Sequence, residues 1–369
     1  MPLSFSHALH ECRTANLGQI DARGKVMVSI GAADLWYFKW IDENCGMPER
    51  HIGVEYYMPK PENLPGNVEW IVNTAGHMPG VGSGVADILF SGQNIEHLWQ
   101  DEVAGFLAEA HRVLKPGGLF VADSPNRAIT EVYGGAHPEH MVELTPEEAV
   151  ELFTAAGFDV VSAKGVFLCR DLRTGEILSI ETLTDAAPNS TIVRCVNASD
   201  HPDASYVWWI QAGRAEREFD ASAVKAVIER YWARGWPERL NRLVSNIGKT
   251  RTADDGRRFW ESDAGEGGAL AYGPYAPLKA GRYRATLFVR PLTSPPGPVL
   301  GHVDVVVTSE AVVKASRDLT SQDLTVDTWT PVSLEFTLDE MIFGFQIRLF
   351  SNGEVALSVE RRIELVVMD

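Results

Sequence analysis

The chain has 369 residues, more than one hydrophobic core usually serves, so we expect two domains and a connector. Its formal net charge of −17 disfavours a nucleic-acid partner, because binding to a phosphate backbone normally needs a basic surface. No apolar run approaches the ~18 residues that cross a bilayer, and the first residues lack the pattern of a secretory signal. Four widely spaced cysteines without a CxxC pair favour reduced thiols in a cytoplasmic protein over a disulfide framework or a zinc site: Cys12, Cys45, Cys169 and Cys195.

Strand-like and helix-like segments alternate up to about residue 165. We predict buried strands over residues 25–30, 51–56, 68–72, 87–90, 119–123 and 158–161. Apolar residues at helical spacing predict a helix over 102–114, and Thr145, Pro146 and Glu148 form a capping box that opens another, ending at Gly157. This alternation predicts an α/β, Rossmann-like, doubly wound and mainly parallel sheet. Residues 205–211 form a further strand, and whether it joins this sheet is open.

The pattern changes in the C-terminal part of the chain. Residues 221–243 predict a helical connector, broken near 235–237. From about residue 256 only strand-like runs follow, separated by Gly, Pro, Ser, Asp and Asn, which is typical of an antiparallel β-sandwich: 281–290, 301–308, 331–337, 344–350 and 356–367. We therefore divide the chain into residues 1–215, a connector over 216–255, and a β-sandwich over 256–369.

Two features in the first part are suited to a ligand. In an open α/β sheet, ligands bind beyond the carboxyl ends of the strands. The turn after the first strand, residues 29–34, has only small residues at its tip, as a close backbone approach requires. Glu55 ends the second strand and supplies a carboxylate where a ribose diol would be held. Taken alone, both features also arise from packing.

Longer motifs are more specific. The segments 87–98 (Asp-Ile-Leu-Phe-Ser-Gly-Gln-Asn-Ile-Glu-His-Leu) and 109–120, which contains His-Arg-Val-Leu-Lys-Pro-Gly-Gly, resemble the fourth strand, helix and fifth strand of class I S-adenosylmethionine (SAM)-dependent methyltransferases. Residues 124–127 and 137–148 fit the same family. The resemblance covers roughly residues 25–165 and is to methyltransferases associated with bacterial surface-polysaccharide synthesis.

The resemblance implies that SAM is the cofactor and that ten residues surround it: Ser29, Gly31, Ala32, Asp34, Glu55, Thr74, Ala75, Ser91, Gly92 and Gln93. Glu55 would hold the ribose, Thr74 and Ala75 the adenine, and the last three would line the floor under the sulfonium and the acceptor. The family's first turn has an acidic residue and three glycines, of which only Gly31 remains here. Ser29 replaces the acid, and Asp34 offers a substitute carboxylate.

Methyl transfer to an alcohol needs a general base, most simply a histidine. The candidates are His140, His137 and His97, with Glu143 orienting an imidazole. The alternative is that His97 packs at a helix start and His140 ties the loop to the core. A divalent cation bound by Glu143 and both loop histidines is the other alternative, but no strong metal-ligand spacing is present, so we expect no metal site.

Residues 272–283 resemble the opening of sandwich modules of the galactose-binding or jelly-roll type. We expect Trp260, Tyr272 and Tyr275 to pack the sandwich or an interface, with stacking on a sugar as the alternative. At least one of Trp208 and Trp209, which alternate across a strand, is expected in the core.

Together these observations predict a cytoplasmic SAM-dependent O-methyltransferase acting on a sugar, as a glycan or a nucleotide-linked precursor, in cell-surface polysaccharide biosynthesis. A catalytically inactive glycan-binding or scaffolding protein and a small-molecule methyltransferase are the alternatives. Homo-oligomerisation and assembly with polysaccharide-synthesis enzymes both stay open.

Overall fold

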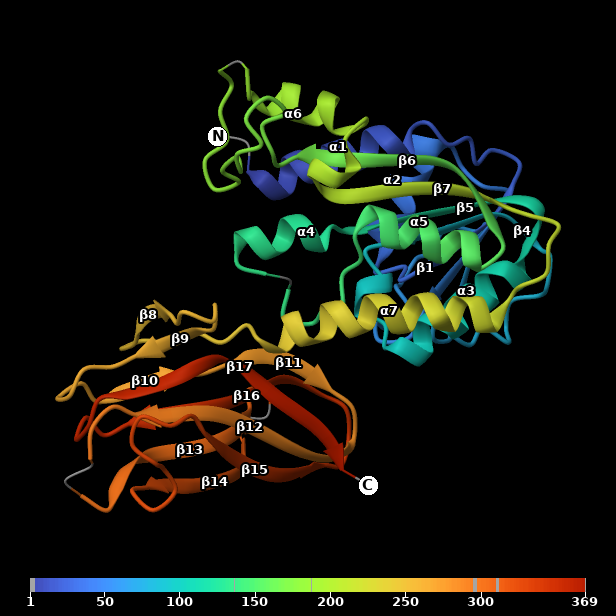
Figure 1. Ribbon diagram of the computed structural model, residues 1–369. Coiled ribbons are helices and arrows are strands. Elements are labelled where there is room, and N and C mark those ends of the chain that lie inside the picture. The colour runs from blue at the N-terminus through green and yellow to red at the C-terminus, as the bar shows by residue number, and fades with distance from the viewer. Residues whose placement is uncertain (1–3, 136, 187, 295–296, 310–311, 369) are drawn as a thin grey trace. The chain divides into compact units, whose positions relative to one another are not determined.

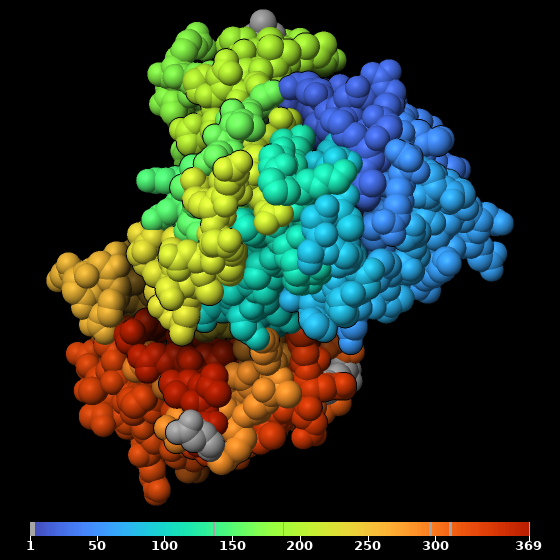
Figure 2. Space-filling model, turned by 90° about the vertical axis from the view of Figure 1, so that its right-hand side faces the viewer, coloured from blue at the N-terminus to red at the C-terminus, as the bar shows by residue number. Residues whose placement is uncertain are grey.

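The computed structural model describes residues 4–135, 137–186, 188–294, 297–309 and 312–368. The chain forms two compact units: Met1–Ala136 with Val142–Gly235, and His137–Met141 with Trp236–Asp369. In Figure 2 the first unit runs from blue to yellow and most of the second from gold to red, and α7 (Ala221–Leu240, yellow) is visible on the surface. No helix among the described residues is both long and apolar enough to span a bilayer.

A seven-stranded sheet forms the centre of the first unit (Figure 1). Its strand order is β3-β2-β1-β4-β5-β7-β6, in which the first five strands are parallel and β7 is antiparallel to β5 and β6. The prediction of a mainly parallel α/β sheet is confirmed, and residues 205–211 belong to it. The strands are β1 (Val26–Ile30), β2 (Arg50–Glu55), β3 (Val68–Val72), β4 (Ala86–Gly92), β5 (Leu114–Pro125), β6 (Phe158–Leu168) and β7 (Ser205–Arg214).

The central strands are buried along nearly their whole length. In β1 and β4 consecutive residues, rather than every second one, are shielded from solvent. This pattern is typical of parallel strands covered on both faces, and it explains why the sequence shows apolar runs there instead of alternation. Trp208 and Trp209 of β7 point to opposite faces and are both fully buried, so the expectation of at least one core tryptophan is confirmed.

Two of the helices follow the predicted periodicity, a third is the predicted connector, and the other four were not predicted. Thr145 caps α5 by accepting the N–H of Glu148, as its capping box predicts. The helix α2 was missed because aromatic and charged residues follow one another in it without a clear apolar period. The helices are α1 (Phe5–Leu17), α2 (Leu35–Cys45), α3 (Gln100–Val113), α4 (Arg127–Thr130), α5 (Pro146–Ala155), α6 (Thr191–Ala198) and α7 (Ala221–Leu240), with 3-10 turns η1 (Ile95–His97), η2 (Glu131–Tyr133) and η3 (Pro202–Ala204).

Two sequence expectations are wrong in the structure. The helix α7 continues through the expected break and contains Pro237, so the loss of one backbone N–H donor near its C-terminal end does not end the helix there. Cys12 of α1 and Cys195 of α6 form a disulfide, although reduced thiols were expected. The other two cysteines, Cys45 and Cys169, are free and buried.

The second unit contains two five-stranded antiparallel sheets, as the predicted runs indicate. One has the order β10-β16-β13-β14, with β11 also paired to β16, and the other the order β15-β12-β17-β9-β8. The strands are β8 (Lys249–Thr252), β9 (Arg258–Glu261), β10 (Gly268–Ala271), β11 (Pro274–Leu278), β12 (Gly281–Pro291), β13 (Val299–Val307), β14 (Val312–Thr320), β15 (Thr330–Leu338), β16 (Ile342–Ser351) and β17 (Leu357–Met368).

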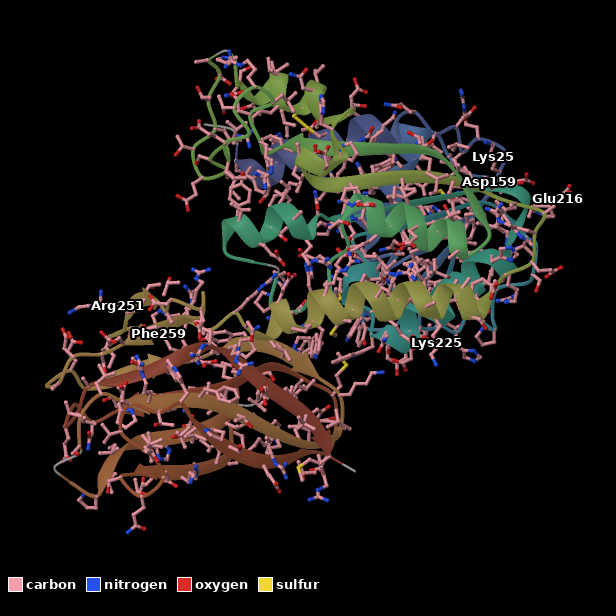
Figure 3. All side chains as sticks on the ribbon, viewed as in Figure 1. Lys25, Asp159, Glu216, Lys225, Arg251 and Phe259 are labelled. Atoms are coloured by element: carbon pink, nitrogen blue, oxygen red, sulfur yellow. A yellow bond between two sulfur atoms is a disulfide. The ribbon has the colours of Figure 1, made fainter. Side chains whose placement is uncertain are left out.

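Buried residues from both sheets form one hydrophobic core, which includes Leu287 of β12 and Ile347 of β16. Figure 3 labels Arg251 on β8 and Phe259 on β9, at one edge of this unit. Trp260 is only 5% exposed and belongs to this core, so the expectation that it packs inside the protein is confirmed. A jelly-roll or galactose-binding identity of this unit stays a prediction.

Candidate functional site

The carboxyl ends of four parallel strands bring most of the predicted site residues to one edge of the first unit's sheet. The chain passes from β1 outward through β2 and β3, and then returns to β4 and β5 on the other side of β1. In open α/β sheets ligands bind at such a reversal of strand order, and Gly31, Glu55 and Gly92 end or follow β1, β2 and β4 at this edge.

The turn after β1 depends on Gly31. Its φ of +70° lies in the left-handed region that favours glycine, and its N–H donates to Val54 O at 3.0 Å. A Cβ at this position would have only Asn94 within 4 Å, at 3.7 Å, so the turn has open space on this side. Ala32 is fully buried. Asp34 is the N-cap of α2 and accepts the N–H of Leu35, which gives its carboxylate a local structural role.

Ser29, which replaces the family's acidic residue, and Trp36, which follows the turn, both make local contacts. Ser29 is fully buried, and its Oγ lies 2.7 Å from Nε2 of His51 on β2. Trp36 is 51% exposed, and its ring contacts those of His10 and Trp40. Its contacts therefore lie with α1 and α2.

Glu55 organises the loop that follows β2. Its Oε1 accepts the backbone N–H groups of the next three residues, Tyr56, Tyr57 and Met58, at 2.9, 2.7 and 3.0 Å. Its Oε2 makes no hydrogen bond to a described residue. One oxygen of this nearly buried carboxylate therefore shapes the loop, and the other is available to a ligand.

Thr74 and Ala75 follow β3 in a tight turn. Thr74 is exposed and forms an isolated bridge with His77, whereas Ala75 is 8% exposed. Gly76 packs directly on α3, where an added Cβ would meet the carbonyl oxygen of Glu102 at 3.3 Å. This contact fixes the turn against the helix.

The turn after β4 is held by β5. Ser91 is buried and accepts from Asn94 Nδ2 at 3.3 Å. Gln93 has a φ of +54°, which is uncommon for a non-glycine residue, and its N–H donates to Asp123 O at 2.8 Å. Its Nε2 also donates to Asp123 Oδ2, at 3.0 Å. Asp123, whose importance the sequence pattern did not reveal, thus anchors this turn.

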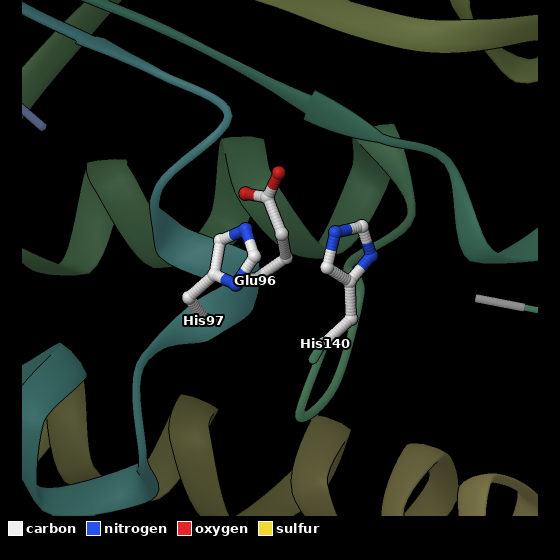
Figure 4. Close-up of side chains that lie close together, drawn as sticks. All are labelled: Glu96, His97 and His140. Atoms are coloured by element: carbon white, nitrogen blue, oxygen red, sulfur yellow. The ribbon is translucent and has the colours of Figure 1, made fainter. Parts of the chain in front are cut away.

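The turn η1 follows directly and carries Glu96 and His97, whose side chains project from it in Figure 4. Glu96 is fully buried, and His97 is half-buried. The N–H of His97 donates to Asn94 O at 3.0 Å. This backbone hydrogen bond fixes η1, and with it His97, next to the turn after β4. A catalytic role for His97 requires that position.

The loop after β5 contains the other three catalytic candidates, divided between the two units. Glu143, in the first unit, is buried and accepts from Thr130 Oγ1. His137 and His140 lie in the segment that groups with the second unit, where their rings are 5.4 Å apart. Arg239 holds this segment by donating to the carbonyl oxygens of His140 at 3.0 Å and of Pro138 at 2.9 Å.

Two cavities of the first unit lie elsewhere. One of about 450 Å³ is lined by His111, Arg112 and Arg214 among others, next to the start of β4 and the end of β7. The other, of about 300 Å³, is lined by residues of the α1–β1 connection and the end of α2. Neither lining contains a predicted cofactor residue, so the candidate site rests on the strand ends rather than on these hollows.

Residues 30–122 match the family model described as "Methyltransferase domain". A probable S-adenosylmethionine-dependent methyltransferase of Mycolicibacterium smegmatis is 44% identical over 84 residues, which is 22% of this chain and 32% of that protein. A protein of the same description from Mycobacterium tuberculosis is 39% identical over 84 residues, covering 22% of this chain and 30% of that protein. The chain therefore matches about a third of the length of these curated relatives.

Solved structures of methyltransferases are also similar to the chain. A SAM-dependent methyltransferase from Archaeoglobus fulgidus has 17% identity and a TM-score of 0.40, covering 57% of this chain and 94% of that one. A SAM-dependent methyltransferase from Mesorhizobium loti has 13% identity and a TM-score of 0.39, covering 57% of this chain and 100% of that one. Residues 30–122 thus match a methyltransferase domain, and over 84 residues the chain is similar to proteins described as probable SAM-dependent methyltransferases.

Proposed function

We propose that the chain is a SAM-dependent methyltransferase whose cofactor lies at the strand ends beside Gly31 and Glu55. The observation that carries the proposal is the coincidence of the family match, residues 30–122, with the strand-end arrangement of the first unit. The match includes Gly31, Glu55 and the Gly92–Gln93 turn, and it ends within β5, one residue before Asp123.

The residues present suit this cofactor. The open space at Gly31 allows a ligand to approach the backbone as closely as the adenosyl and methionine portions require. Glu55 Oε2 is the acceptor for the ribose hydroxyls, while Oε1 keeps the adjoining loop in place. Thr74 and Ala75 would border the adenine, and Ser91, Gly92 and Gln93 would form the floor under the sulfonium.

When bound, SAM supplies an electrophilic methyl group. The protein's main task is then to hold an acceptor oxygen in line with that group and to remove its proton. We assign the proton removal to His140, with His97 and His137 as the other candidates. A neutral imidazole accepts a proton near neutral pH, which suits an alcohol acceptor. Glu143 would support the loop from which these histidines come, through its bond to Thr130.

For the acceptor we propose a sugar, as a glycan or a nucleotide-linked precursor, used in cell-surface polysaccharide synthesis. This part rests on the motif resemblance and on the presence of the two antiparallel sheets of the second unit. Because Trp260 lies in the core, the aromatic candidates for stacking on a sugar are Tyr272 and Tyr275, which are half-buried. Cytoplasmic location and assembly with polysaccharide-synthesis enzymes belong to the same proposal.

A scaffolding protein without catalysis is the second candidate, and a specific observation favours it. Ser29 occupies the position of the family's acid and is bonded to His51, and Asp34 caps α2. With Ser29 bonded to His51 and Asp34 capping α2, the turn after β1 has no carboxylate that is used only for binding the cofactor. A methyltransferase acting on a small metabolite or a protein side chain is the third candidate.

Calorimetry with SAM and S-adenosylhomocysteine tests the cofactor site, with Gly31→Ala and Gly117→Ala as a matched pair. The two glycines have φ values of +70° and +74°, so both substitutions impose similar backbone strain, but Gly117 lies at the opposite end of β5. We expect wild type and Gly117→Ala to bind both compounds and Gly31→Ala to bind them about tenfold or more weakly. Absence of binding to the wild type would exclude the cofactor assignment.

Methyl-transfer assays then separate the three candidates. Labelling of sugars or nucleotide sugars, with little labelling of other alcohols, supports the sugar acceptor. Labelling of non-sugar acceptors alone would refute it and favour the third candidate. Cofactor binding without transfer to any member of a panel of sugars, nucleotide sugars, small alcohols and proteins favours the scaffold.

A further inference from the structure

A buried ion pair joins α1 to the strand ends. The guanidinium of Arg13 contacts both oxygens of Asp123, with Nε–Oδ2 at 2.6 Å and Nη2–Oδ1 at 3.0 Å. Asp123 is fully buried, and the side chain of Arg13 is only 15% exposed. Burial by itself lowers the pKa of Arg13, but the facing carboxylate outweighs this effect and raises the pKa, so the guanidinium stays charged. Such a pair tolerates burial only with well-formed hydrogen bonds.

The same carboxylate controls the turn after β4. Asp123 accepts from Gln93 Nε2 through Oδ2 and from Gln93 N through its carbonyl oxygen. These two bonds hold Gln93 at positive φ, a conformation that is unfavourable for a non-glycine residue and persists only where the surroundings enforce it. Arg13 is thus connected through Asp123 to the Gly92–Gln93 turn, which we assign to the floor of the site.

Gly92 shows how tightly these groups are arranged. A Cβ at this position would lie 2.8 Å from Arg13 Nη2 and 2.8 Å from Asp123 Oδ1. Neither atom can withdraw without breaking the ion pair, so the glycine, the pair and Gln93 form one unit. On the far side, the guanidinium of Arg13 lies 5.5 Å from the ring centre of Trp40, which limits its movement there.

We propose that Arg13 is a positioning residue for methyl transfer, which acts through Asp123 to hold the Gly92–Gln93 turn in the geometry that aligns the cofactor with the acceptor. This inference rests on the proposed function. It gives α1 a role that the sequence motifs do not indicate, because Arg13 lies outside residues 30–122. The helix is then part of the site and not only a cover for the sheet.

The structure offers a matched control for Arg13. Arg23 also makes a two-bond contact with an aspartate, Asp21, with Nε–Oδ1 at 2.8 Å and Nη2–Oδ2 at 3.1 Å. This second pair is exposed, with 76% of the Arg23 side chain in solvent, and it lies outside the strand ends. Comparing Arg13→Ala with Arg23→Ala therefore separates the loss of an arginine–aspartate pair from the loss of this particular position.

Affinity for S-adenosylhomocysteine is the first readout, measured by calorimetry on the full chain. We expect Arg13→Ala to bind about tenfold more weakly than wild type, and Arg23→Ala to bind like wild type. Free guanidinium at millimolar concentration, far below denaturing levels, should restore part of the affinity of Arg13→Ala and leave wild type unchanged. A general loss of stability would not respond in this way.

Two further results decide the inference. If Arg13→Ala does not fold, Asp123→Asn is used in its place, because the amide keeps the shape of the side chain and an acceptor for Gln93 but loses the charge. In this variant, an affinity for S-adenosylhomocysteine that is weaker by about threefold or more supports the inference. Unchanged affinity in a folded variant of either kind overturns it. Failure of the wild type to bind S-adenosylhomocysteine would instead refute the proposed function.

Discussion

Ser29 Oγ and His51 Nε2 lie 2.7 Å apart on adjacent strands, and both side chains are fully buried. The acidic residue expected at the end of β1 is therefore replaced by a neutral pair. Burial lowers the pKa of His51 from 6.5 to about 4, because the charged imidazolium loses its hydration there. This shift makes His51 a source of pH-dependent stability.

Acid lowers the stability of the protein through His51, because the folded and unfolded chains bind protons differently there. Between about pH 6.5 and pH 4 the unfolded chain binds a proton at His51 and the folded chain does not, so acid favours unfolding. The stability is complete above pH 6.5 and falls by up to roughly 3 kcal/mol as the pH approaches 4. We expect His51→Gln to reduce this decline, measured from about pH 7 to about pH 4.5 as the urea midpoint of the transition that unfolds the first unit. The exposed His7, replaced in the same way, should leave it intact; equal declines in both variants would refute the assignment.

Substitution of Glu55 separates loop support from cofactor binding. Glu55→Ala removes the acceptor of three backbone N–H groups and should cost about 1–3 kcal/mol of stability as well as cofactor affinity. Glu55→Gln keeps an oxygen acceptor, so its stability should stay near that of wild type while SAM binds about tenfold more weakly. Calorimetry and thermal unfolding give the two readouts. Glu69→Gln, at an exposed carboxylate on β3, is the control. If Glu55→Gln binds SAM as tightly as wild type does, the assignment of Glu55 to the ribose is refuted.

His140→Ala tests the base. If His140 removes the acceptor proton, turnover with an acceptor from the panel should fall by about 10²-fold or more, and SAM affinity should hardly change. His77→Ala, at an exposed histidine, serves as the control. Unaltered turnover would remove His140 from this role, and the same assay would then be applied to His97 and His137.

The disulfide between Cys12 and Cys195 predicts a response to reductant. The two residues are 183 positions apart, so the bond restricts the unfolded chain strongly and should contribute about 2–4 kcal/mol. We expect dithiothreitol to lower the thermal midpoint of wild type. It should leave the midpoints of Cys12→Ser and Cys195→Ser unchanged, because neither variant can form the bond. Four titratable thiols in denatured, unreduced wild type would contradict the bond.

The parallel sheet was predictable because its signals are local. Buried strands such as β1 and β4 are apolar runs, and the capping box at Thr145 marks the start of α5 within four residues. Placing Gly31 and Glu55 at one edge needed only the rule that parallel strands end together.

The features that were missed depend on distant partners. Arg13 and Asp123 are 110 positions apart, and nothing near either residue indicates the other. The disulfide is likewise invisible in the spacing of the cysteines. The strand β14 was missed for a different reason, since most of its residues are at least partly exposed and carry no apolar alternation.

The second unit contains two arginine–carboxylate pairs that differ mainly in burial. Arg348 binds both oxygens of Asp304 across β16 and β13, at 2.7 and 2.6 Å, and the Asp304 side chain is 6% exposed. Arg284 and Glu335 pair across β12 and β15 with both side chains about half exposed. Removing a carboxylate from the buried pair leaves an arginine charge poorly compensated, whereas water replaces the partner in the exposed pair.

We therefore expect Asp304→Asn to destabilise the second unit by about 1–3 kcal/mol and Glu335→Gln by less than about 1 kcal/mol. Unfolding of a chain with two units is not expected to be two-state, so a local measurement is needed. Hydrogen exchange followed in peptides from β13 and β16 provides it, with peptides from β1 and β4 as an internal reference. Loss of protection in β13 and β16 for Asp304→Asn alone agrees with the burial argument. Equal changes in the two variants would mean that the exposed pair contributes as much as the buried one.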